Sequence, residues 1–235
     1  MSAVWQIGSV TLGQGPRLVA AGGDAEVDAL AGAHAADLVE LRGDLFDDPS
    51  AARVTAALER LAAAGRPVVF TARAASEGGR AMPEDRRAAL YDAALPLVQA
   101  IDVEIASRAL AERLAPRARA RGCRLVLSAH DFARTPPADA LDALVEHGRA
   151  LGADLVKIAT TTATLADVQT LLALTLVRRA TGLVTLGMGP YGPLTRIVLP
   201  AAGSLLTYGS VGRPTAPGQL SVADIRRLFD SLLPA

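Results

Sequence analysis

One lysine is the most reactive side chain that this sequence offers. Among 24 basic residues, Lys157 is the only lysine and all the others are arginine. Lysine differs from arginine because its amine can lose a proton and attack a carbonyl carbon. A lysine that merely survived a bias toward arginine is the alternative interpretation, and the composition alone leaves both open. If Lys157 is buried among cationic neighbours, we expect the neutral amine, which condenses with a ketone or an aldehyde, to be favoured.

Two further side chains could move and orient a proton beside this lysine. His130 has a side chain that titrates near neutral pH, and Glu77 lies in the loop 74–79, four residues beyond Arg73. A carboxylate in that loop could hold the imidazole in place and raise its basicity. No His, Asp or Glu spacing suggests a metal site, and the single cysteine, Cys123, provides neither a disulfide framework nor a metal cage. The pattern predicts imine chemistry without a metal or an organic cofactor.

The elements that must position these residues are short β-rich runs alternating with helical segments. The expected strands are Arg17–Ala21, Asp37–Arg42, Pro67–Arg73, Ala100–Ile105, Arg124–Phe132, Asp154–Thr160, Leu183–Gly189 and Ser204–Ser210. The helical segments between them include Ala51–Ala64, Pro83–Val98, Ser107–Arg121 and Asp139–Leu151. Such alternation demands a parallel sheet, and eight units close into a barrel.

The sequence therefore predicts an α/β fold: a single (β/α)8 TIM barrel that spans residues 1–235 as one catalytic domain. The alternating stretch Val4–Leu12 is expected to form a short N-terminal β-hairpin that closes one end. A doubly wound open sheet is the competing layout. It is disfavoured because Gly22-Gly23-Asp24, after the first strand, lacks the third glycine of a dinucleotide-binding fingerprint.

Alternation of side chains within the strands separates an aliphatic face from a charged face. The aliphatic face must meet the helices, so the charged face points into the barrel. The inward charged residues are Glu40, Arg42, Arg73, Glu104, His130 and Lys157. Asp102 is also expected inward but lower, and Glu104 is expected to pair with an arginine or with Lys157. A structural ion-pair network is the alternative, but these residues gather near the strands' C-terminal ends, where barrel enzymes build their active sites.

Composition excludes several classes of protein. The formal net charge of the 235 residues is zero and aromatic residues make up 3%, which argues against a nucleic-acid binder. A hydrophobic fraction of 51% excludes a disordered chain. Because no uninterrupted apolar run of membrane-spanning length and no signal peptide are apparent, we expect a cytoplasmic protein without membrane partners.

In their shared order and spacing, the motifs around these residues resemble the type I 3-dehydroquinate dehydratase family over nearly the whole chain. The matching stretches are Val39-Glu40-Leu41-Arg42-Gly43-Asp44, Thr71-Ala72-Arg73 with Glu77-Gly78-Gly79, Ile101-Asp102-Val103-Glu104, Ser128-Ala129-His130-Asp131-Phe132 with Thr135-Pro136, Ala153-Asp154-Leu155-Val156-Lys157-Ile158-Ala159, Gly187-Met188-Gly189, Thr195-Arg196-Ile197, Gly203-Ser204 and Ala216-Pro217-Gly218-Gln219.

The resemblance implies a Schiff-base-forming hydro-lyase of the shikimate pathway that works as a homodimer and converts 3-dehydroquinate to 3-dehydroshikimate. Lys157 would form the imine, His130 would act as general acid and base, and Glu77 would hold His130. The implied substrate-binding residues are Arg196 and Gln219 on the carboxylate, Glu40, Arg42 and Arg73 on the ring hydroxyls and neighbouring network, Met188 and Tyr208 along the apolar side of the ring, and Thr215 in the last loop.

The sequence departs from the family pattern at two places near the site. Thr215 stands where the family usually has serine, which keeps the hydroxyl and adds a methyl group. Ala129 replaces the aromatic residue that commonly precedes the catalytic histidine, and its parity predicts an outward side chain.

Two rival functions remain open at the level of sequence. A class I aldolase would use the same lysine on a phosphorylated sugar, with 209–212 as a phosphate cradle after the eighth strand. A catalytically silent barrel retained to bind a partner protein would be expected to have lost at least one of Lys157, His130 and Glu77, and all three are present.

Overall fold

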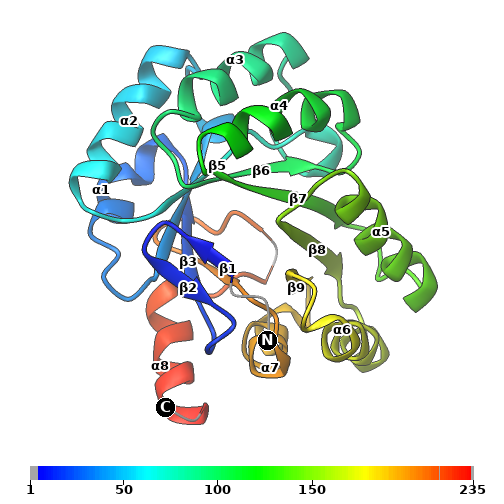
Figure 1. Ribbon diagram of the computed structural model, residues 1–235. Coiled ribbons are helices and arrows are strands. Elements are labelled where there is room, and N and C mark those ends of the chain that lie inside the picture. The colour runs from blue at the N-terminus through cyan, green and yellow to red at the C-terminus, as the bar shows by residue number, and fades with distance from the viewer. Residues whose placement is uncertain (1–4, 217, 234–235) are drawn as a thin grey trace.

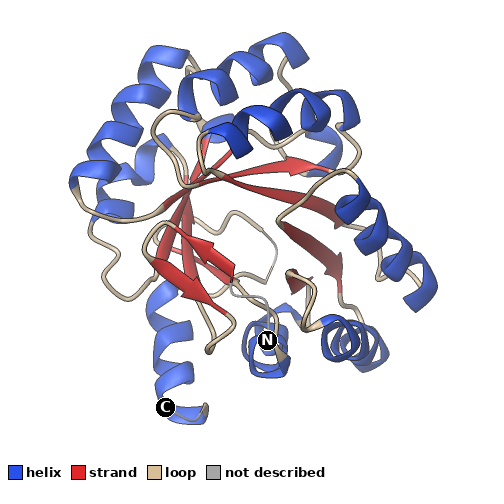
Figure 2. Ribbon diagram, viewed as in Figure 1, coloured by secondary structure: helices blue, strands red, loops and turns tan. Residues whose placement is uncertain are grey.

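The computed structural model describes residues 5–216 and 218–233, so Val4 of the expected hairpin and Pro217 of the last matching motif lie outside it. Within these ranges, eight parallel strands form a nearly closed barrel in the order β10-β3-β4-β5-β6-β7-β8-β9, and eight α-helices surround it (Figures 1 and 2). The predicted (β/α)8 barrel is confirmed. No helix in the described ranges is long and apolar enough to cross a membrane.

The bounds of the elements differ from the sequence prediction by a few residues at most strand and helix ends. The barrel strands are β3 (Leu18–Gly22), β4 (Leu38–Arg42), β5 (Val68–Thr71), β6 (Ala100–Glu104), β7 (Arg124–Asp131), β8 (Leu155–Thr161), β9 (Leu183–Met188) and β10 (Thr207–Ser210). The helices are α1 (Val27–Ala31), α2 (Ala51–Ala63), α3 (Glu84–Ala94), α4 (Arg108–Ala120), α5 (Ala138–Ala150), α6 (Leu165–Arg178), α7 (Gly192–Ala202) and α8 (Val222–Leu232).

The largest differences are at α3 and β10. The prediction carried α3 to Val98, but the helix ends at Ala94: the Leu95 N–H still donates to Tyr91 O, and Pro96 then has no N–H with which to continue the ladder. The prediction began the last strand at Ser204, but the regular ladder of β10 begins only at Thr207. In between, Ser204 bridges to β9: its Oγ accepts from the Thr185 N–H at 2.9 Å, and the Leu205 N–H donates to Leu183 O at 3.0 Å. A side chain thus replaces part of the ladder where the barrel closes.

Two separate cores confirm the expected division of strand faces. The outer core packs the helices against outward residues such as Val39 and Leu41 of β4. The inner core fills the barrel with inward residues such as Leu38 and Val69. Ala129 belongs with the outer core, as its parity predicted. The remaining inward positions, nearer the C-terminal ends of the strands, are the polar ones.

A two-stranded antiparallel hairpin closes the end of the barrel at which the strands begin, as expected (Figure 1). It consists of β1 (Trp5–Ile7) and β2 (Val10–Leu12), and Ile7 and Leu12 are buried in the inner core. Arg17 Nε donates to Thr11 O at 2.9 Å, and Arg124 Nε donates to Gln6 O at 3.0 Å, which ties the hairpin to the first residues of the barrel strands. Apolar residues of the hairpin therefore seal this end of the barrel.

Candidate active site

A pocket opens at the C-terminal ends of the strands. The structure brings together in it all eleven residues singled out from the sequence: Glu40, Arg42, Arg73, Glu77, His130, Lys157, Met188, Arg196, Tyr208, Thr215 and Gln219. Strands β4, β7 and β8 supply Glu40, Arg42, His130 and Lys157, and the segment after β5 supplies Arg73 and Glu77. Helix α7 supplies Arg196, and the loop after β10 supplies Thr215 and Gln219.

Lys157 projects into this pocket from β8 and is almost fully buried, with 3% of its surface exposed. Its Nζ forms an ion pair with Asp102 Oδ2, lies 3.8 Å from Glu40 Oε1 and stands over the Tyr208 ring, 4.6 Å from the centroid. The two charged groups in contact with the amine are carboxylates, so the cationic neighbours on which the expectation of a neutral amine depends are not its direct contacts.

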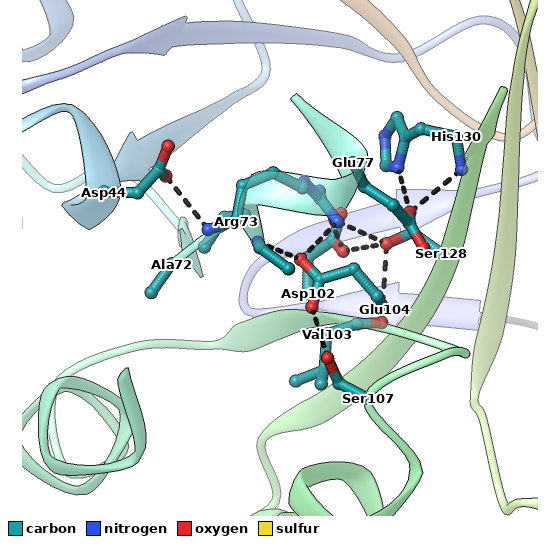
Figure 3. Close-up of polar contacts among 12 residues, drawn as sticks. Asp44, Ala72, Arg73, Glu77, Asp102, Val103, Glu104, Ser107, Ser128 and His130 are labelled. Carbon is teal, nitrogen blue, oxygen red and sulfur yellow. Dashed lines mark hydrogen bonds and ion pairs between the residues drawn. The ribbon is translucent and has the colours of Figure 1, made fainter. Parts of the chain in front are cut away.

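Asp102 has a more central place in the site than its lower inward position on the strand predicted. It lies on β6 with no exposed surface, and besides Lys157 it binds Arg73 Nη2 at 3.1 Å and accepts from Ser128 Oγ at 2.6 Å (Figure 3). Burial alone would raise the pKa of the Asp102 carboxyl, but Arg73 and Lys157 together hold that pKa below its usual value. Asp102 is therefore a carboxylate, and its inward parity was the available signal.

Glu104 pairs with two arginines, and an arginine is one of the two partners expected for it from the sequence. Its Oε1 accepts from Arg73 Nη1 at 3.1 Å, and its Oε2 accepts from Arg87 Nη2 at 2.5 Å. Arg73 Nη1 also donates to Ser128 Oγ at 2.6 Å. Figure 3 shows the Arg73 guanidinium facing the two carboxylates of β6. Both Nη atoms of Arg73 therefore have protein partners before any ligand arrives.

Arg42 and Glu40, on β4, are likewise engaged within the protein. Arg42 forms a bidentate pair with Asp44, with N–O distances of 2.9 and 2.8 Å. Glu40 Oε1 accepts from Thr71 Oγ1 at 2.8 Å. Both residues still line the pocket, so each can bind a ligand through the side-chain nitrogen or oxygen atom that is not used in these contacts.

His130 is held by Glu77, as the sequence predicted for this pair. Glu77 ends a single 3-10 turn (Ala75–Glu77), and its Oε2 accepts from the His130 backbone N–H at 2.9 Å and lies 2.8 Å from His130 Nδ1. Gly78, at φ +84°, turns the chain here, and a Cβ at this position would collide with the Phe132 ring. With Nδ1 bound to Glu77, the Nε2 atom of the ring is left to exchange protons with a ligand.

Burial shifts the pKa of both partners toward the uncharged form. It raises the pKa of Glu77 to about 7, and it lowers the pKa of His130 well below its usual value, with Arg73 and Lys157 adding to the effect. The imidazole is therefore neutral at neutral pH, which is the form that a proton-abstracting base needs.

Arg196 differs from the other cations of the pocket. It is 2% exposed, its Nε has no hydrogen-bond partner, and no ion pair to it occurs among the described residues. Burial lowers the pKa of Arg196 to about 10, which still leaves it charged at neutral pH. Because a buried charge without a partner is strongly unfavourable, Arg196 points to an anionic ligand.

Gln219 and Thr215 hold the loop after β10 against the pocket. Gln219 Oε1 accepts from the Thr215 backbone N–H at 2.7 Å and from Thr215 Oγ1 at 3.1 Å. The amide nitrogen of Gln219 is the atom left for a ligand. The threonine found where the family usually has serine thus keeps the hydroxyl contact to the glutamine.

Comparisons with known proteins agree with this geometry. A family model described as type I 3-dehydroquinase matches residues 21–233. A 3-dehydroquinate dehydratase from Methanococcoides burtonii is 33% identical over 232 residues, which covers 97% of this chain and 99% of that relative. The structure of 3-dehydroquinate dehydratase from Geobacillus kaustophilus is similar over 100% of both chains, with a TM-score of 0.89 and 26% identity. The type I 3-dehydroquinate dehydratase from Clostridium difficile with covalently modified comenic acid matches over 98% of both chains, with a TM-score of 0.88 and 26% identity.

The pKa of Glu77 generates a prediction about stability. Because this pKa is raised from 4.5 to about 7, the folded protein binds more protons than the unfolded chain between those values. The stability contributed by Glu77 is thus fully present below pH 4.5 and is lost as the pH rises through 7, by about 3 kcal/mol. Glu77→Gln can still accept from His130 but does not titrate. The unfolding free energy of the variant minus that of the wild type should therefore increase as the pH rises from 4.5 to 8.

Urea denaturation at several pH values measures this gap. Glu59→Gln, at an exposed position of α2, is the matched control and should track the wild type throughout. A gap between Glu77→Gln and the wild type that stays constant or narrows with rising pH would contradict the assigned shift.

Proposed function

The chain belongs to the type I 3-dehydroquinase family and is a hydro-lyase, and from this premise we propose that it removes water from 3-dehydroquinate through an imine on Lys157. His130 serves as general acid and base, and Glu77 orients it. The observation that carries the proposal is the placement of Lys157 and His130 on neighbouring strands. Ser128 pairs with Lys157 and His130 pairs with Ala159, so both side chains face the same pocket two residues apart in register.

The reaction begins with attack of the Lys157 amine on the C3 ketone of the substrate. The ketone oxygen leaves as water with one amine hydrogen and one proton from solvent, which gives a protonated imine that withdraws electrons from the neighbouring carbon and acidifies its C–H bond. His130 Nε2 takes the C2 proton, and the electron pair of that bond enters the imine as an enamine. The C1 hydroxyl then leaves with the proton from His130 as water, and hydrolysis of the imine releases 3-dehydroshikimate and restores the amine.

Asp102 and Glu40 supply the electrostatics for this sequence. The two carboxylates that flank Lys157 Nζ would also flank the positive charge of the protonated imine, which forms at the same atom. Since Arg73 helps to keep Asp102 ionised, the negative charge is in place before the substrate binds. The carboxylates would thereby stabilise the electron-withdrawing form of the intermediate.

The substrate carboxylate is assigned to Arg196 and Gln219. Arg196 is the buried cation without a protein counter-ion among the described residues, and Gln219 has its amide nitrogen free for a ligand. Glu40, Arg42 and Arg73 would meet the ring hydroxyls, and Met188 would line the apolar side of the ring. Covalent attachment of a ligand has a parallel in the Clostridium difficile relative, which was solved with covalently modified comenic acid.

The aldolase alternative receives less support. A phosphate after the eighth strand would need free backbone N–H groups in 209–212, but the Ser210 N–H donates to Leu220 O. The Glu26 side chain also lies beside Gly212, where a Cβ would be 3.4 Å from Glu26 Oε1. A carboxylate at this position repels a phosphate.

Family membership further suggests a cytoplasmic enzyme of the shikimate pathway, with residues 1–235 as one catalytic domain. We also propose a homodimer. The outer face of α6 carries three exposed apolar side chains, Leu165, Leu176 and Val177, and is the candidate contact. Sedimentation at a protomer mass of 24.2 kDa at micromolar concentration would contradict the dimer.

The proposed reaction is tested by following the absorbance of the conjugated enone product with 3-dehydroquinate as substrate. The wild type should turn over without added metal, and His130→Ala should lose more than the roughly 10²- to 10⁴-fold expected for one proton transfer, because His130 serves two. His147→Ala, at an exposed position of α5, is the matched control and should retain activity. Absence of turnover in the wild type, or near-normal rates in His130→Ala, would contradict the assignment.

A further inference from the structure

Tyr208 carries a polar atom that the proposed reaction does not use. Among the described residues, four buried side-chain atoms lack a hydrogen-bond partner: Asp102 Oδ2, Arg196 Nε, Thr207 Oγ1 and the Tyr208 hydroxyl. Asp102 Oδ2 is satisfied by its ion pair with Lys157. Thr207 precedes Tyr208 on β10, so it points to the opposite face, away from the barrel interior. The two that remain, on Arg196 and Tyr208, belong to residues that line the same pocket.

A buried hydroxyl without a partner destabilises a fold. Moving a hydroxyl from water into a site where nothing binds it costs free energy, and phenylalanine would fill the same space without that cost. Tyr208 is 4% exposed, so water in the bulk does not satisfy the oxygen. The hydroxyl is therefore accounted for most directly by a ligand that accepts a hydrogen bond from it.

The surroundings of Tyr208 indicate which group of the ligand accepts this hydrogen bond. The face of its ring is occupied by Lys157 Nζ, 4.6 Å from the centroid. Burial, followed by Glu40 and Asp102, raises the pKa of Tyr208 well above its usual value, so the hydroxyl keeps its proton and can donate. Tyr208 and Arg196 line the same pocket, so a single ligand group can meet both side chains.

We propose that the Tyr208 hydroxyl donates a hydrogen bond to the same ligand carboxylate that Arg196 binds, and that it makes the pocket selective for a carboxylate-bearing ring. This inference rests on the proposed function, because it takes the carboxylate of 3-dehydroquinate as the acceptor. It assigns Tyr208 a polar binding role beyond the apolar lining that the family resemblance implied. The two unsatisfied donors of the empty pocket would both be satisfied in the complex.

The test is Tyr208→Phe, which removes one oxygen atom and leaves the ring in place. The KM for 3-dehydroquinate and the Kd for 3-dehydroshikimate should rise about tenfold, because a hydrogen bond to a charged acceptor is lost. The kcat should stay within about threefold, because the hydroxyl does not touch the reacting carbons. The melting temperature should stay equal or rise, because the deleted atom has no protein partner to lose.

Tyr91→Phe is the matched control for stability. The Tyr91 hydroxyl is also fully buried, but it donates to Asp102 O at 2.6 Å and accepts from the Ala72 N–H at 3.1 Å. Its removal should lower the melting temperature. A similar fall in Tyr208→Phe would mean that the Tyr208 hydroxyl has a protein partner, and would overturn the proposal.

A double-mutant cycle and a truncated ligand identify the acceptor. If Tyr208 and Arg196 bind one carboxylate, the losses of 3-dehydroshikimate affinity in Tyr208→Phe and Arg196→Lys should be non-additive. The same hydroxylated cyclohexanone ring without its carboxylate should inhibit wild type and Tyr208→Phe equally. Unchanged KM and Kd in Tyr208→Phe, additive losses, or a fall in kcat alone would each overturn the proposal. A wild type that binds 3-dehydroshikimate without turning over 3-dehydroquinate would instead contradict the proposed function and leave the affinity comparison intact.

Discussion

The polar interior of this barrel depends on the pairing of Asp102 with its two cations. A carboxylate with no exposed surface is tolerable only where positive groups and hydrogen-bond donors surround it, and here Lys157, Arg73 and Ser128 do so. The pairing fixes the Lys157 amine at the centre of the pocket and leaves Arg73 to bridge β6 to β7. Removal of this one carboxylate would leave Lys157 and Arg73 with fewer counter-ions, and Ser128 Oγ with only the more distant acceptor Val103 O, at 3.4 Å.

The two ends of the barrel strands have different roles: the N-terminal ends contribute to stability and the C-terminal ends form the pocket. Near their N-terminal ends the inward residues are apolar, and the β1–β2 hairpin seals them from water. Near their C-terminal ends many inward residues are charged and paired, whereas Arg196, which reaches the pocket from α7, has no ion-pair partner among the described residues. In the proposed function, the carboxylate of the ligand supplies the counter-ion that Arg196 lacks.

Much of this arrangement could be predicted from the sequence, because it follows from alternation. The two-residue period of the strands gave the inward positions of Glu40, His130 and Lys157, and barrel closure then brought distant segments to one end. Alternation does not specify partners, and for that reason Asp102 was placed inward but was not recognised as the counter-ion of Lys157. The Ser204 bridge escaped prediction because it replaces backbone ladder with a side chain, which leaves no periodic signal. The missing partner of the Tyr208 hydroxyl is a property of three-dimensional packing and has no trace in the sequence.

The central claim is that Lys157 forms a covalent imine with the ligand, and borohydride trapping tests it most directly. Reduction in the presence of 3-dehydroquinate should yield one ligand-derived adduct per chain, located by peptide mapping on the segment that contains Lys157, and none without ligand. Because the chain has no other lysine, the α-amino group of Met1, which lies outside the described residues, is the only competing amine. Lys157→Arg should fold and show no adduct at this segment. Trapping only at Met1, or robust turnover by Lys157→Arg, would contradict the account.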